Sequence, residues 1–126
     1  MASVDDYLDD VRSQNLGVMR VEMPSVLTES FNVRNNAQHD FYSNDRNLRG
    51  LAEGYGKGIL TYLKENPGIT KVITDNGHGK SDPGAPGKDG KSETYFTKEI
   101  QRHLANFLRR EGTKIRSGLQ VFPLNY

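Results

Sequence analysis

The chain has 126 residues and no cysteine, which fits one domain of ordinary size and excludes disulfide bonds, thiolate zinc sites and cysteine nucleophiles. Its 17 Lys and Arg against 16 Asp and Glu give a net charge of +1, which removes the electrostatic argument for a nucleic-acid partner. No apolar run approaches the roughly 20 residues of a membrane helix, so we expect no membrane segment. The chain has three histidines, so a metal site can take few of its ligands from histidine.

The amino-terminal third is predicted to hold one helix and two extended runs. Acidic residues in the first turn favour a helix over residues 4–14. The first ten residues lack an apolar stretch, so we expect no secretory signal there. Residues 18–23 alternate in the manner of a strand, and residues 25–28 resume an extended run that has Glu29 at its end. A polar loop is predicted over residues 32–36.

Two amphipathic helices carry the clearest patterns. The first is predicted over residues 45–64, and its apolar side chains share one face: Leu48, Leu51, Ala52, Tyr55, Ile59, Tyr62 and Leu63. Gly54 and Gly58, four residues apart, would let a neighbouring backbone come close. The second is predicted over residues 95–110, with an inward face of Phe96, Ile100, Leu104, Phe107 and Leu108. Gly112 fits the C′ position after it.

Short strands are predicted on either side of the second helix. Residues 70–74 form a β-branched run, and residues 113–115 are predicted to start another strand. Because strands alternate with helices across short joints, we predict an α/β domain with a partly parallel sheet flanked by helices. Residues 66–68 have the length of an ordinary loop, so a single domain is expected over residues 1–126.

The glycine-rich loop over residues 75–90 holds the most informative side chains. His78 stands between two glycines after a predicted strand, where α/β sheets place their sites. Glu93 follows 15 residues later, and a loop of that length can bring it beside His78. Imidazole and carboxylate both ligate zinc, so the pair is a candidate metal site. The alternative is a surface histidine and a glutamate that stabilises a helix start.

This segment resembles a known family. Val-Ile-Thr-Asp-Asn-Gly-His-Gly at residues 72–79, then Asp-Pro-Gly-Ala at 82–85 and Glu93, is similar to the opening motif of the zinc-dependent N-acetylmuramoyl-L-alanine amidases. That family degrades peptidoglycan and includes many phage lysins. The resemblance implies that His78 and Glu93 are zinc ligands.

The amino-terminal half resembles the closing motif of the same family. The similarity lies in Leu-Gly-Val-Met-Arg at residues 16–20 and Met-Pro-Ser-Val-Leu-Thr-Glu at 23–29. It implies that Glu29 is the catalytic carboxylate. Residues 1–66 then resemble the family's C-terminal half and residues 69–112 its N-terminal half, as in a circular permutation. The family's middle segment has no counterpart here.

The resemblance implies hydrolysis of the amide between the muramic acid lactyl group and L-alanine, with peptidoglycan as the substrate. Zinc would polarise the carbonyl and activate water, and Glu29 would act as base and then as acid. An enzyme without a secretory signal fits a phage or prophage lysin that is made in the cytoplasm and acts on the cell wall, and it equally fits a cytosolic fragment.

The family's third zinc ligand, a histidine of the missing middle segment, leaves two alternatives to an active enzyme. One is a non-catalytic peptidoglycan-binding or structural remnant. The other is a subunit whose site is completed by a partner chain, or by a second copy contributing His39 or His103. On its own helix, His103 is expected to be half-exposed.

Overall fold

The computed structural model describes residues 23–78 and 82–116. By its contacts the chain divides into two units, Met1–Ser30 with Val121–Tyr126, and Phe31–Gln120, which are described separately. The helix predicted over residues 4–14 and nearly all of the strand predicted over residues 18–23 lie outside the described residues. The single domain over residues 1–126 stays a prediction.

In the first unit, residues 23–30 are described, and they form neither a helix nor a strand. The extended run predicted over residues 25–28, with Glu29 at its end, is therefore not part of a strand. Val26 is 80% exposed, so the apolar side chains of this run gain little from burial. Pro24 also carries no N–H to donate to a neighbouring strand. The β-branched pattern alone does not make a strand where side chains find no apolar surface to cover.

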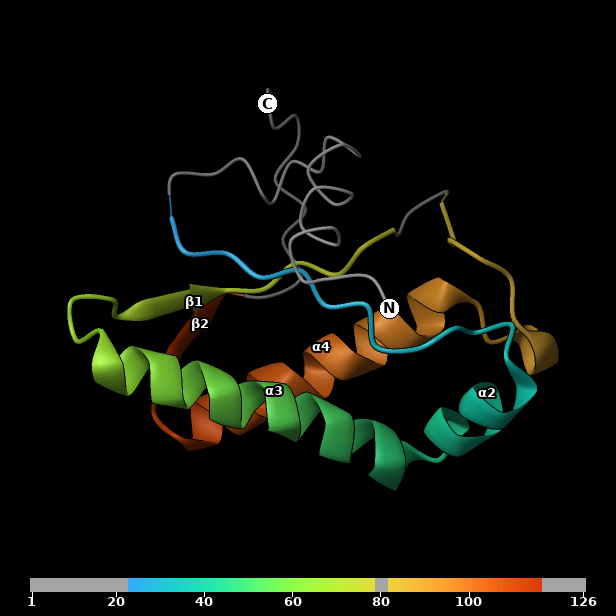
Figure 1. Cartoon of the computed structure of the whole chain (residues 1–126), viewed down its shortest axis with the longest axis horizontal. Helices are drawn as coiled ribbons and strands as arrows, with labels where there is room; N and C mark the ends of the chain where they lie inside the picture. Colours follow the sequence, from blue (N-terminus) through green and yellow to red (C-terminus); the bar gives the residue numbers. More distant parts are fainter. Residues whose placement is uncertain (1–22, 79–81, 117–126) are drawn as a thin grey trace, which may run out of the picture. The chain divides into compact units, whose positions relative to one another are not determined.

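The described part of the second unit forms helices α2 (Asn36–Ser43), α3 (Asp45–Glu65) and α4 (Glu93–Arg110), strands β1 (Lys71–Ile73) and β2 (Lys114–Arg116), and the short 3-10 helix η2 (Lys88–Gly90). Figure 1 shows α3 and α4 side by side and running in the same direction. The parallel strands and flanking helices confirm the predicted α/β class. No helix within the described ranges has the length and apolar character needed to cross a membrane.

Strands β1 and β2 pair in parallel, with Val72 opposite Ile115. Parallel neighbours need a crossover connection, and α4 supplies it, so β1, α4 and β2 form a βαβ unit. Val72 and Ile115 are half-buried against the helices, while the flanking residues of both strands are exposed. The strands predicted over residues 70–74 and 113–115 are thus confirmed to within one residue or so.

The core lies mainly between α3 and α4. One cluster contains Ala52, Leu104, Phe107 and Leu108, and a second contains Val33, Leu48 and Phe96. These clusters confirm the predicted inward faces of both helices up to Ile59 of α3, whereas Tyr62 is exposed and Leu63 belongs to neither cluster. The ion pairs of α3 with α4, Asp45 with His103 and Glu53 with Arg110, follow the same parallel register.

The close approach between α3 and α4 occurs at Gly56. A Cβ added at Gly56 would lie 2.2 Å from Cδ1 of Phe107, whereas Gly54 and Gly58 face open space. The prediction that Gly54 and Gly58 admit a neighbouring backbone is therefore wrong. Gly54 and Gly58, four residues apart, do share one face of α3. The buried face is a different one, which contains Leu48, Ala52 and Gly56.

Asparagine caps explain an element that the sequence pattern did not predict. The Asn35 side chain accepts from the Gln38 N–H, so α2 begins at residue 36, the last residue of the predicted polar loop. Asn44 caps α3 in the same way, as predicted for the start of that helix. At the carboxyl end of α4, Gly112 has φ +79° and the Thr113 N–H donates to the Leu108 carbonyl. This confirms the predicted glycine cap.

Candidate metal centre

The chain leaves the carboxyl end of β1 and runs along α4 toward His78. The Gln101 side chain donates to the Thr74 carbonyl oxygen at 3.0 Å, and the Thr97 hydroxyl donates to the Gly77 carbonyl at 3.3 Å. His78 itself has φ +64°, a left-handed conformation that is uncommon outside glycine. The loop is thus fixed on the helix just where its backbone is strained.

Past residue 81 the loop returns to the amino-terminal end of α4. The Glu93 N–H donates to the Ala85 carbonyl at 2.9 Å and the Thr94 N–H to the Pro83 carbonyl at 3.0 Å. These bonds satisfy backbone donors that a helix start leaves without intrahelical partners. In return, the Ala85 N–H donates to Oε2 of Glu93 at 2.9 Å. The Glu93 carboxylate is therefore held by the loop through one oxygen.

The other oxygen of Glu93 faces His78. Nε2 of His78 lies 3.3 Å from Oε1 of Glu93, and the two side chains are 35% and 38% exposed. Gly84, with φ +70°, closes over the pair: an added Cβ would lie 2.7 Å from both His78 Cδ2 and Glu93 Oε2. The structure thus brings together the two residues that the sequence singled out, and leaves room beside them only for glycine.

A second carboxylate lies on the opposite side of the imidazole. Nδ1 of His78 donates to Oδ2 of Asp82 at 2.9 Å, because an ionised carboxylate can only accept. This bond, together with the charge of Glu93, raises the pKa of His78 despite partial burial. The same bond and the Gly84 N–H lower the pKa of Asp82. We call His78, Asp82 and Glu93 the loop cluster.

The donor chemistry of the loop cluster fits zinc. Bonds of about 2.0–2.2 Å in a tetrahedral site place two ligand atoms roughly 3.3–3.6 Å apart. The 3.3 Å between His78 Nε2 and Glu93 Oε1 agrees with that separation. One imidazole nitrogen and one carboxylate oxygen are also an accepted zinc pair. Catalytic zinc sites have three protein ligands, of which this pair would supply two.

The other two histidines are buried away from solvent. His39, on α2, is 1% exposed and packs edge-on against Phe96, and its Nε2 has no hydrogen-bond partner among the residues that the structure describes. His103, on α4, is 7% exposed, so the expectation of a half-exposed residue is wrong. Both rings are buried in this chain, and the contribution of either histidine to a site in another copy stays a prediction.

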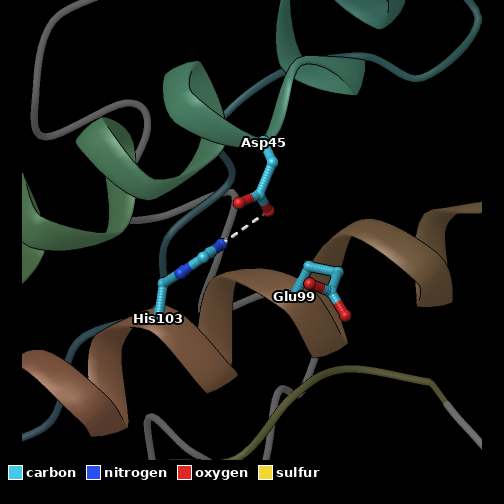
Figure 2. Close-up of side chains that lie close together, drawn as sticks. All are labelled: Asp45, Glu99 and His103. Carbon is cyan, nitrogen blue, oxygen red and sulfur yellow. Dashed lines mark hydrogen bonds and ion pairs between the residues drawn. The ribbon is translucent and has the colours of Figure 1, made fainter.

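His103 instead belongs to another cluster, which the sequence analysis missed. Figure 2 shows Asp45 reaching from the start of α3 to the ring of His103, with Glu99 one turn earlier on α4. His103 Nε2 donates to Asp45 Oδ1 at 2.8 Å, and this bond lowers the pKa of Asp45. We call these residues, with Arg102, the helix cluster. The only sequence signal was the spacing of Glu99 and His103, four residues apart on one helix.

One ligand atom each from Asp45, Glu99 and His103 lies within 4.8 Å of the others, close enough for a metal ion to bridge them. Arg102 already supplies a cation there. Its guanidinium lies 2.6 Å from Glu99 Oε2 and 3.6 Å from Asp45 Oδ1. A metal would have to displace this guanidinium, so the helix cluster fits zinc less well than the loop cluster does.

Glu29, the predicted catalytic carboxylate, is an exposed residue of the first unit, outside any helix or strand. It is thus accessible to a substrate. Its catalytic role stays a prediction that rests on the resemblance of its sequence motif.

Comparison with known proteins gives one match. Residues 72–118 match the family model described as N-acetylmuramoyl-L-alanine amidase. No curated protein and no solved structure matches the chain. The matched residues cover most of the βαβ unit and include all of the loop cluster, so this part of the chain is similar to peptidoglycan amidases. The closing motif and the circular permutation lie outside the match and stay predictions.

Proposed function

We propose that this chain is a zinc-dependent N-acetylmuramoyl-L-alanine amidase that acts on peptidoglycan. The observation that carries the proposal is the pairing of His78 Nε2 with Glu93 Oε1, at 3.3 Å, inside the segment that matches the amidase family model. A family match over a loop without this geometry would support ancestry alone. A His–Glu pair without the match would be compatible with many metal sites.

In this proposal His78 and Glu93 hold the metal, and the loop keeps them in place. When bound, zinc supplies Lewis-acid chemistry that polarises the scissile carbonyl and makes water nucleophilic near neutral pH. The Ala85 N–H fixes Oε2 of Glu93, so the carboxylate keeps Oε1 toward the imidazole. The closing motif assigns Glu29 as the carboxylate that would take a proton from the attacking water and then deliver it to the leaving amine of L-alanine.

A second candidate is a subunit whose zinc site is completed by a partner chain. It is favoured by the burial of His39 and His103, which leaves His78 as the one exposed histidine of the three. A site with two protein ligands holds zinc less firmly than one with three, and a less firmly placed centre loses rate steeply. The chain alone is therefore expected to bind zinc weakly and to hydrolyse peptidoglycan slowly or not at all.

The test combines a zinc titration by calorimetry with release of stem peptides from purified peptidoglycan. His78→Ala should lose zinc binding together with any peptide release, whereas Glu29→Gln should keep zinc and lose release. Glu111→Gln, an exposed carboxylate beyond α4, is the matched control. Zinc binding that survives in His78→Ala would contradict the proposed metal site. Tight one-to-one zinc with fast hydrolysis by the monomer would rule out the partner-chain candidate.

A further inference from the structure

Each of the three oxygen atoms of Asp82 accepts a hydrogen bond from a nearby residue. Its Oδ2 accepts from Nδ1 of His78 at 2.9 Å, and its Oδ1 accepts from the Gly84 N–H at 3.0 Å. Its backbone carbonyl accepts from the hydroxyl of Thr94, on the first turn of α4, at 3.3 Å. The carboxylate is therefore held in place from both its side chain and its backbone, although it is exposed to solvent.

The two carboxylates of the loop cluster contact different nitrogens of the His78 ring. Asp82 lies at Nδ1, and Glu93 lies at Nε2. Asp82 is thus on the wrong side of the imidazole to share a metal ion with Nε2 and Glu93. A ring nitrogen must be unprotonated to ligate a metal, so ligation by Nε2 requires the proton of the neutral ring to stay on Nδ1.

Without Asp82, the remaining carboxylate would favour the wrong tautomer. Glu93 accepts hydrogen bonds as readily as Asp82 does, and it would draw the ring proton to Nε2, the nitrogen that faces it. With both present, the shorter contact is the one to Asp82, 2.9 Å against 3.3 Å. The arrangement therefore places the proton on Nδ1 and points the lone pair of Nε2 toward Glu93.

We propose that Asp82 is a positioning residue that sets the tautomer and the orientation of His78 for metal binding. The inference rests on the proposed function, in which His78 is a zinc ligand. Histidine ligands of metals commonly donate their second ring N–H to a carboxylate, which raises their basicity and fixes the ring. An ordinary surface ion pair would contribute little to stability, and its carboxylate would not need the additional hydrogen bonds that hold Asp82 in place. Here His78 and Gly84 both have positive φ.

The experiment compares Asp82→Asn with Asp89→Asn. Asparagine at position 82 keeps an oxygen for the Gly84 N–H, so the turn is retained, but it removes the charge that holds the proton on Nδ1. Asp89 is an exposed carboxylate of η2 in the same loop, and its substitution makes the same change in charge. Circular dichroism melts of both variants check that each is folded.

The first readout is the ¹⁵N NMR spectrum of the His78 ring in the metal-free chain, at a pH where the ring is neutral. We expect the Nδ1–H tautomer in the wild type and in Asp89→Asn, and a shift toward Nε2–H in Asp82→Asn. The second readout is zinc affinity by calorimetry, which should fall about 10–100-fold in Asp82→Asn and stay unchanged in Asp89→Asn.

The outcomes separate this inference from the proposed function. If His78→Ala loses zinc binding while Asp82→Asn keeps both the wild-type affinity and the Nδ1–H tautomer, the positioning role is overturned and the amidase proposal stands. If His78→Ala binds zinc as well as the wild type, the proposed metal site is wrong, and the positioning role falls with it. An equal loss of affinity in Asp82→Asn and Asp89→Asn would show a general effect of charge and would also overturn the inference.

Discussion

Helix α4 takes part in two histidine–carboxylate clusters that differ in burial and in charge balance. In the loop cluster, a half-exposed imidazole lies between two carboxylates, with Glu93 at the first turn of the helix. In the helix cluster, His103 is buried and the carboxylates of Asp45 and Glu99 are shared with the guanidinium of Arg102. Similar ligand types thus occur twice along one helix in different settings.

The difference shows why ligand type and proximity do not by themselves define a metal site. The helix cluster joins the start of α3 to the middle of α4, and its cation comes from the protein, so it serves as a structural contact. The loop cluster is anchored by backbone bonds and directs one nitrogen and one oxygen to a common point. We therefore expect zinc at the loop cluster, and the predictions below test the contrast.

The largest expected effect is on zinc affinity, and it should distinguish two glutamates of the same helix. Glu93→Gln keeps an acceptor for the Ala85 N–H but removes the charged ligand, so affinity should fall more than ~100-fold. Glu99→Gln should leave affinity within about twofold, because Glu99 is paired with Arg102. Calorimetric titration measures both. A larger loss in Glu99→Gln would move the metal site to the helix cluster.

The next effect concerns the glycine that closes over the loop cluster. Gly84→Ala places a methyl group 2.7 Å from His78 and Glu93, so it should separate the pair and destabilise the fold by about 1–3 kcal/mol more than Gly90→Ala. Gly90 has the same φ of +70° but faces open space, so its substitution isolates the backbone strain. Urea unfolding and zinc titration of both variants measure the difference. Equal stabilities would show that the loop relaxes around the added methyl.

A smaller effect is expected on the α3–α4 face that carries the helix cluster. Gly56→Ala should destabilise the fold by about 1–2 kcal/mol, because the overpacking against Phe107 outweighs the gain in helix propensity. Gly58→Ala, which faces open space, should stabilise by up to ~1 kcal/mol. Thermal unfolding compares them, and zinc affinity should not change in either. Stabilisation by Gly56→Ala would contradict the packing of the two helices.

The same contrast explains what the sequence could predict. The apolar faces of α3 and α4 and the short strands were predictable because periodicity reports burial directly. The closeness of His78 and Glu93 followed from a glycine-rich loop that joins a strand end to a helix start. Asp82 was part of the quoted motif, but the nitrogen it contacts depends on the left-handed turn at His78, which no pattern reveals.

The misses have a physical cause in tertiary contacts. His103 was predicted from its own helix alone to be half-exposed, yet Asp45, 58 residues away in the sequence, contacts it from the neighbouring helix. The strand expected before Glu29 has the right residue types, but its side chains are not buried in a sheet. Helix α2 depends on the cap at Asn35. Its sequence is mostly polar, so it lacks the apolar periodicity from which a helix is predicted.

The smallest expected effect is the pH dependence of stability due to Asp45. Its hydrogen bond from His103 and the charge of Arg102 lower the pKa of the Asp45 carboxyl below its ordinary 3.8 in the folded chain. A group whose pKa is lower in the folded state binds fewer protons there than in the unfolded state. It therefore stabilises the fold above pH 3.8, and this contribution is lost as the pH falls through the folded-state pKa.

Asp45→Asn should consequently lower the melting temperature slightly at pH 5–6, and the difference from the wild type should disappear as the pH falls below 3.8 and through the lowered folded-state pKa of Asp45. The effect is small because Asp45 is exposed and solvent screens its interaction. Melting curves recorded every half pH unit, with Asp89→Asn as the control, measure it. A difference that grows toward low pH would mean that the Asp45 carboxylate does not stabilise the helix cluster. Zinc affinity should be the same in Asp45→Asn as in the wild type, since the carboxylate at the start of α3 takes no part in the loop cluster.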